Sequence, residues 1–219
     1  MKLLIYHMKK HAHLENQAPM TAYMKNQFPF LGIKSVERRK ISHPFIKEWK
    51  KTKTINWDLV HTLWELPERE YQYIACDYLK AMQQYLSPND LASIKNLITK
   101  KSWWDSVDAL LKNVGYLSVQ YPEVKETVKQ WANDSNIWLV RTAILHQLGL
   151  KSETDTALLE EVITINFGTE EFFINKAIGW ALREYAKTNP EWVTHFLLTN
   201  REKLHPLSWR EANKHLKVQ

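Results

Sequence analysis

The sequence predicts an all-α fold, a curved right-handed solenoid of HEAT-like helical-hairpin repeats. Three observations lead to this prediction. The chain has 219 residues but only 5 glycines, where average usage would give about 15, and a sheet protein with many tight turns could hardly form with so few. Apolar residues recur at helical spacing almost from end to end. The helices also repeat at a constant interval along the chain.

Short polar stops, such as SPND at 87–90 and NDSN at 133–136, divide the helical pattern. Ser102 followed by Asp105 resembles a capping box at the start of one helix. No connection is long or rich in Gly, Ser or Pro, so we expect a single domain over residues 1–219. The predicted helices span residues 18–28, 35–50, 56–65, 68–84, 88–100, 103–118, 122–133, 136–149, 155–166, 170–188, 190–200 and 207–217.

A shift of 34 residues brings three columns of similar residues into register. The first column holds Ala75, Ala109, Ala143 and Ala177, and the second holds Cys76, Leu110, Ile144 and Ile178. The third lies near the helix starts and holds Glu70, Trp104, Trp138 and Phe172. Each interval is long enough for a helical hairpin, and stacked hairpins form a solenoid in which the alanines let neighbouring helices approach closely.

Composition narrows the function classes. The net charge of +6 favours a polyanionic partner, and the 10 tryptophans provide indole rings that also stack on bases and sugars. One cysteine cannot form an internal disulfide and suits a cytoplasmic protein. No apolar stretch predicts a signal peptide or a membrane span. The sequence also lacks metal-ligand spacing, a P-loop, a dinucleotide-binding glycine fingerprint and a nucleophile elbow.

Residues four apart lie on one side of a helix. On three successive repeats, such a stripe, separate from the face expected to pack in the core, mixes aromatic and ionisable side chains. The stripes are Trp104, Asp108, Lys112; Trp138, Thr142, His146; and Phe172, Lys176, Trp180. Side by side they would form the wall of a binding groove. Arg141 projects from the edge of the same stripe and would reach either a phosphate or Asp108.

Ordinary structural explanations compete with this groove. Trp138 and Phe172 are more simply core residues, Trp103 is structural, and His146 is a packing or surface histidine. Asp105 is most simply a capping residue. Asp108 differs, since no cap explains a carboxylate in the second turn of a helix, although a solvated face remains an alternative.

Long stretches of the chain resemble the AlkD-type DNA alkylation-repair glycosylases, from about residue 18 to the C-terminus. The stretches are YMKNQFPFLGI at 23–33, LWELPEREYQ at 63–72, KSWWDSVD at 101–108, NIWLVRTAIL at 136–145, KAIGWALREYAKTNP at 176–190 and SWREANKHL at 208–216. The family fold is a curved stack of HEAT-like repeats. Lys34 and Val36 depart from the family pattern, which often has glutamine and proline there.

The resemblance implies a set of site residues and a reaction. The family's catalytic aspartate corresponds to Asp108, its sugar-facing tryptophans to Trp104 and Trp180, its site arginine to Arg141 and the tyrosine of its YMKN segment to Tyr23. The implied reaction is hydrolysis of the N-glycosidic bond of N3- or N7-alkylated purines in duplex DNA, without a cofactor or metal and by a monomer. A helical-repeat scaffold that binds DNA or protein without catalysis is the alternative.

Basic side chains provide candidates for contacts with DNA phosphates. They are Arg141, Lys176, Arg183 and Lys187, with Lys101 and Lys214 as weaker candidates.

Overall fold

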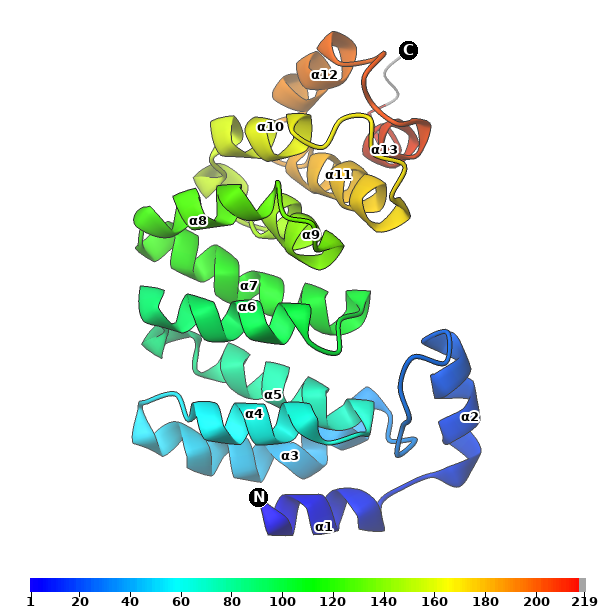
Figure 1. Cartoon of the computed structure of the whole chain (residues 1–219), viewed down its shortest axis with the longest axis vertical. Coiled ribbons are helices and arrows are strands. Elements are labelled where there is room, and N and C mark those ends of the chain that lie inside the picture. Colours follow the sequence, from blue (N-terminus) through cyan, green and yellow to red (C-terminus); the bar gives the residue numbers. More distant parts are fainter. Residues whose placement is uncertain (217–219) are drawn as a thin grey trace. The chain divides into compact units, whose positions relative to one another are not determined.

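The computed structural model describes residues 1–216, and helices are its only regular secondary structure within that range (Figure 1). The predicted all-α fold is therefore confirmed. The chain divides into two compact units, Met1–Leu86 and Ser87–Gln219. The curvature, the handedness and the single domain stay predictions. None of the helices in residues 1–216 combines the length and apolarity needed to cross a membrane.

The first unit contains five α-helices and two short 3₁₀ helices among its residues. They are α1 (Lys2–Lys10), α2 (Leu14–Tyr23), α3 (Ser35–Trp49), η1 (Lys50–Thr52), α4 (Trp57–Glu65), α5 (Arg69–Ala81) and η2 (Gln83–Tyr85). The second unit contains η3 (Pro88–Asp90), α6 (Leu91–Thr99), α7 (Trp104–Gln120), α8 (Glu123–Trp131), α9 (Ile137–Leu145), η4 (Lys151–Glu153), α10 (Thr156–Thr164), α11 (Phe172–Tyr185), α12 (Pro190–Thr199) and α13 (Pro206–Ala212).

The predicted helices from residue 35 onwards match observed ones, with differences mainly at their ends. The helix predicted over 207–217 ends at Ala212, and residue 217 lies outside the described residues. The Ser102–Asp105 capping box is wrong: the N-cap of α7 is Trp103, and the Ser102 hydroxyl donates instead to the Ile98 carbonyl over 2.6 Å. Ser102 thus closes the turn after α6.

The N-terminal region differs most from the prediction. The helix predicted over 18–28 begins earlier and ends at Tyr23, because Lys25 and Asn26 adopt left-handed φ values of 56° and 59°. Helix α1 was not among the predicted helices. This helix buries Leu4 and Met8, one turn apart, and packs on α3.

A buried carboxylate holds the loop that follows α2. Glu70, at the start of α5, accepts hydrogen bonds from the backbone N–H groups of Leu31, Gly32 and Ile33 at 2.9–3.0 Å. Burial raises the pKa of Glu70, and these backbone donors act in the opposite direction. Three loop donors are satisfied by one side chain, so the path of the chain between α2 and α3 is fixed from α5.

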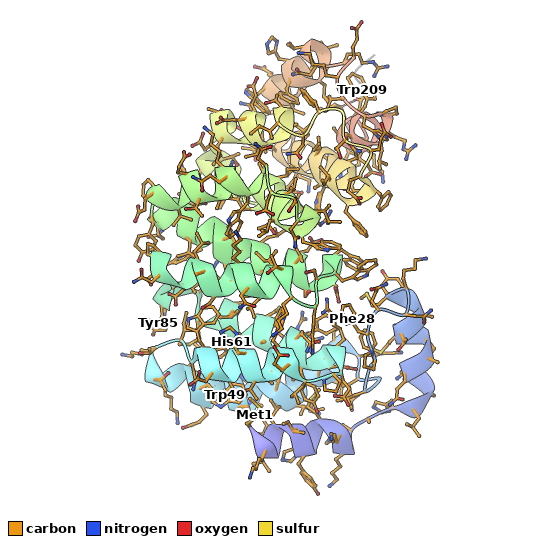
Figure 2. All side chains as sticks on the ribbon, viewed as in Figure 1. Met1, Phe28, Trp49, His61, Tyr85 and Trp209 are labelled. Atoms are coloured by element: carbon orange, nitrogen blue, oxygen red, sulfur yellow. The ribbon has the colours of Figure 1, made fainter. Side chains whose placement is uncertain are left out.

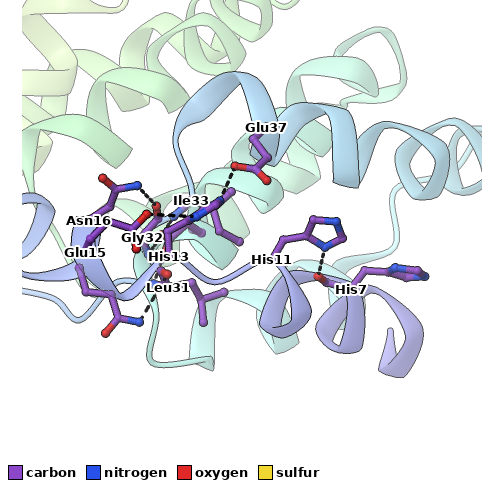
Figure 3. A network of polar contacts seen from close by, with 11 residues as sticks. His7, His11, His13, Glu15, Asn16, Leu31, Gly32, Ile33 and Glu37 are labelled. Carbon is purple, nitrogen blue, oxygen red and sulfur yellow. Dashed lines mark hydrogen bonds and ion pairs between the residues drawn. The ribbon is translucent and has the colours of Figure 1, made fainter.

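Polar contacts, rather than a buried face, attach α2 to the rest of the first unit (Figure 3). No residue of α2 is buried. His13 Nε2 lies 2.9 Å from Glu37 Oε2, and the Asn16 amide donates to the Gly32 carbonyl over 3.1 Å. Gly32 has a φ of 85°, and a Cβ there would come 2.1 Å from the His13 carbonyl oxygen. This position therefore requires glycine.

The second unit is built in two layers. Helices α7, α9, α11 and α13 contact one another in series, while α8 and α10 contact each other and α9. The apolar column Cys76, Leu110, Ile144 and Ile178 is buried throughout, as a repeat predicts. The prediction that the alanine column lets neighbouring helices approach closely is wrong for Ala109, which is exposed. Glycine provides the close approach instead: a Cβ on Gly115 would lie 2.3 Å from the His146 carbonyl oxygen.

The buried His146 should make the stability of the protein pH-dependent. Its side chain lies in the core, with Nδ1 2.7 Å from the Ala143 carbonyl, and burial lowers its pKa to about 4. Because the unfolded chain takes up this proton near pH 6.5 and the folded protein does so only near pH 4, stability should fall as pH is lowered through that range. The loss attributable to His146 is about 3 kcal/mol.

Urea unfolding of the wild type and His146→Gln at pH 7 and pH 4.5 measures this effect. Glutamine does not titrate but retains a polar side chain of similar reach. The carboxylates are common to both proteins, so the difference between their pH dependences isolates His146. Equal losses of stability on acidification would contradict the assignment.

Candidate functional site

An ion pair between α7 and α9 forms the centre of the candidate site. Arg141 donates from Nε to Asp108 Oδ1 over 2.9 Å and from Nη2 to Asp108 Oδ2 over 2.8 Å. This two-point geometry fixes the plane and direction of the carboxylate. The Asp108 side chain is 16% exposed and the Arg141 side chain 6%. The pair is therefore largely buried, with a small part of the Asp108 side chain still open to solvent.

Three influences act on the Asp108 carboxyl group. Burial raises its pKa, the hydrogen bonds and charge of Arg141 oppose this shift, and the nearby charge of Asp105 adds to it. Asp105 lies in the first turn of the same helix. The arrangement provides a carboxylate that is little hydrated and held in one orientation, and such a group stabilises a positive charge placed beside it.

A third helix completes the support of Arg141. Its Nη1 donates to the Phe173 carbonyl over 2.9 Å, so the first turn of α11 also fixes the guanidinium. The rings of Trp103, Trp138 and Phe173 contact one another with centroids 4.9–5.7 Å apart. This aromatic cluster packs the starts of α7, α9 and α11 together, at the end where the ion pair forms.

The structure changes the predicted groove wall. Of the three stripes, the α9 stripe is buried: Trp138, Thr142 and His146 are 9%, 0% and 2% exposed. This part of the prediction is wrong, because α9 is enclosed by helices of both layers. Trp138 and His146 are packing residues, as the simpler explanation had it. Phe172, in contrast to Trp138, is 55% exposed, so the prediction that Phe172 is a core residue is also wrong.

The remaining predicted site residues lie on separate elements. Trp104 begins α7, one helical turn before Asp108, and is half-buried. Trp180 is half-buried in the middle of α11. Tyr23 is the last residue of α2 in the first unit, and 70% of it is exposed. The structure thus joins Asp108 to Arg141 directly, and the shared role of the other three side chains stays a prediction.

Two of the predicted phosphate-binding residues are held by one carboxylate. Lys176 Nζ lies 2.9 Å from Glu211 Oε1, and Arg183 donates to Glu211 Oε2. Both cations lower the pKa of Glu211. Gly179 lies between them on α11, and a Cβ there would come 2.5 Å from that of Glu211. This glycine allows α13 to bring Glu211 against α11.

The other basic candidates have different surroundings. Lys187, in the turn after α11, pairs with Glu184, Lys101 adopts a φ of 51° in the turn before α7, and Lys214 is exposed. Arg141 is directed towards Asp108, the second of the two partners predicted for it, and its contact with a phosphate stays a prediction.

Sequence reasoning missed two groups that shape the site. Glu211 lies within the SWREANKHL stretch, where its acidic character among basic residues was a usable signal. The Phe173 carbonyl is a backbone group, and no side-chain pattern points to it. Among residues 1–216, no cluster of three or more His, Cys, Asp or Glu side chains is arranged to hold a metal ion.

Two comparisons with known proteins indicate the same family. The model of the family described as "DNA alkylation repair enzyme" matches residues 4–216. A solved structure described as a predicted DNA alkylation repair enzyme from Enterococcus faecalis is 38% identical in sequence and has a TM-score of 0.85. The similarity covers 94% of this chain and 97% of that one. No curated protein gives a significant match.

The Asp108–Arg141 pair should be strongly coupled in stability. Arg141→Met leaves a buried carboxylate without its partner and should lower the free energy of unfolding by about 3 kcal/mol. In the Asp108→Asn background, Arg141→Met leaves no unpaired carboxylate, so the loss in the free energy of unfolding should be smaller by about 1 kcal/mol or more. Urea unfolding of the two single variants and the double variant gives the coupling energy. Additive losses would show that the pair does not act as a unit.

Proposed function

Because this chain belongs to the DNA alkylation repair enzyme family, we propose that it is a DNA glycosylase. Its substrate would be duplex DNA that carries N3- or N7-alkylated purines, and the reaction would hydrolyse the N-glycosidic bond. The observation that supports this proposal most is the oriented, poorly hydrated Asp108 carboxylate beside Arg141.

The chemistry of the substrate explains why one carboxylate would suffice. Alkylation at N3 or N7 makes the purine cationic, so the base leaves with the electron pair of the C1′–N bond and needs little protonation. Positive charge then develops on the deoxyribose, at C1′ and the ring oxygen. Asp108 would stabilise this oxocarbenium ion and orient the water that adds to C1′. Enzymes that cleave unactivated sugars use a second carboxyl group as an acid.

Arg141 would act on Asp108 rather than on the base. Its two hydrogen bonds hold the carboxylate, and the Phe173 carbonyl holds the guanidinium in turn. The buried pair therefore needs little rearrangement as the charge develops, which is the condition under which a fixed anion lowers a barrier most. Trp104 and Trp180 would provide indole faces for the deoxyribose, and Tyr23 would contact the DNA.

The basic side chains would bind the phosphates around the lesion. Glu211 holds Lys176 and Arg183 in place, and a phosphate that binds them would have to compete with this carboxylate. Lys187, Lys101 and Lys214 would add contacts of ordinary surface type. Each phosphate contact contributes about −0.9 to the slope of log affinity against log salt concentration.

The central prediction concerns Asp108→Asn. Asparagine keeps the shape of the side chain but removes the charge, so the variant should bind lesion duplexes nearly as well as the wild type. Base release should fall roughly 100-fold or more, as is common when one transition-state charge contact is lost. Single-turnover assays on a duplex with one 7-methylguanine, with released base separated by chromatography, measure this.

Asp105→Asn provides the matched control, one turn earlier on the same helix. It should retain base release. Because the Asp105 charge raises the pKa of Asp108, the acid limb of the rate profile should move to lower pH in this variant. Loss of activity in Asp105→Asn alone would show that the catalytic role was given to the wrong carboxylate. A wild type that binds duplexes but releases no base would favour the scaffold alternative.

The adjacent tryptophans at 103 and 104 should fail differently. Trp103 packs on Trp138 and Phe173, so Trp103→Ala should destabilise the protein by about 2–4 kcal/mol while folded molecules keep their activity. Trp104→Ala should cost less stability and more base release. Thermal melts and single-turnover assays on both variants separate the effects. A Trp104→Ala variant that melts far below Trp103→Ala yet excises normally would reverse the assignment.

A further inference from the structure

The positive charge of the protein is concentrated at its N-terminal end. Residues 1–53 contain 12 Lys and Arg but only 3 Asp and Glu, whereas residues 54–219 contain 18 and 21. The segment that carries the candidate site therefore has a slight negative balance, and the excess of positive charge belongs to α1, α3 and η1 of the first unit. Such an asymmetry indicates a second place on the molecule where an anionic partner is favoured.

An open groove of about 810 Å³ lies along α3 beside the C-terminal end of α1. Its lining includes Lys34 and Lys40 and three apolar residues, Val36, Ile41 and Phe45, which are together called the apolar floor. Val36 is 80% exposed, so its apolar side chain is accessible to a partner. The lining also includes His7 of α1, His11 directly after α1 and Glu37 of α3, which are labelled in Figure 3.

The charges in the groove are available to a partner. Lys34 and Lys40 are exposed, and neither forms an ion pair with a carboxylate in residues 1–216. The acidic group in the lining, Glu37, is hydrogen-bonded to His13 Nε2 at 2.9 Å, and the two lysines outnumber it. Pro44 on α3 has no N–H, so it cannot donate to the Lys40 carbonyl in the helix. The groove thus combines an apolar floor with unpaired cations.

We propose that this groove binds an acidic amphipathic segment of another protein. Apolar side chains at helical spacing would fill the floor over Val36, Ile41 and Phe45, and carboxylates would meet Lys34 and Lys40. The apolar floor decides against nucleic acid as the occupant. The outer surface of a duplex presents phosphates and sugars, which would satisfy the lysines but leave the apolar side chains uncovered. The groove uses none of the residues assigned to base release.

The test uses the full-length protein and a fluorescein-labelled peptide of about 16 residues. The peptide carries leucines at i, i+3, i+4 and i+7 and glutamates or aspartates elsewhere, and its charge-reversed form carries lysines in their place. Fluorescence anisotropy should show micromolar binding of the acidic peptide that weakens with salt, and no comparable binding of the reversed one. Asp108→Asn should bind the peptide as the wild type does.

Two groove variants and one control locate the binding. Val36→Glu and Lys40→Glu should each weaken the acidic peptide about tenfold or more. Both positions are exposed, so the variants should fold, which circular dichroism checks. Lys203→Glu makes the same charge change at an exposed position of the second unit and should have little effect.

Several results would overturn the proposal. They are equal affinity for both peptides, no binding of the acidic peptide, or equal weakening by all three variants. Complete displacement of the peptide by unmodified duplex DNA, together with loss of DNA binding in Val36→Glu, would assign the groove to DNA instead.

Discussion

The candidate site depends on one buried ion pair, Asp108 with Arg141. Contacts from three helices of the second unit offset the free-energy cost of burying it. Removing two charges from water is expensive, and only close geometry with further hydrogen bonds offsets that cost. The structure meets this condition with the paired contacts between α7 and α9 and with the Phe173 carbonyl from α11. Three helices are therefore tied to the position of one carboxylate. The same contacts that satisfy the charge also give the site its rigidity.

A related solution occurs in the first unit. Glu70 occupies the repeat position of Trp104, Trp138 and Phe172, near the start of its helix. In α5 this position holds a buried carboxylate that binds three backbone N–H groups of the loop at Leu31–Ile33. In α9 it holds an indole that packs against its neighbours. The residue at the start of the repeated helix thus holds a neighbouring segment in place. In α5 the Glu70 carboxylate holds the loop at Leu31–Ile33, and in α9 the Trp138 ring packs against the starts of α7 and α11.

The sequence predicted the fold class well because helical periodicity and short capped connections depend on local residue patterns. The helices from α3 onwards and the buried column at Cys76, Leu110, Ile144 and Ile178 follow from those patterns. The site was only partly predictable. Position on one helix can indicate that Trp104 and Asp108 share a side, but not that Thr142 and His146 are enclosed by other helices. Burial of α9 depends on the packing of other helices around it. The hydrogen bond from Arg141 to the Phe173 carbonyl involves a backbone group, so no side-chain pattern predicts it.

The polar attachment of α2 has a consequence for local opening and for sequence change. Since no α2 residue is buried, unfolding this helix would expose little apolar surface that the fold now covers. Its opening free energy is set mainly by a few hydrogen bonds near its first turn, each worth about 0.5–1.5 kcal/mol, and is separate from that of the core. Hydrogen exchange in α2 should therefore be faster than in α7 or α9. For the same reason, substitutions of exposed α2 residues should change the stability of the core little.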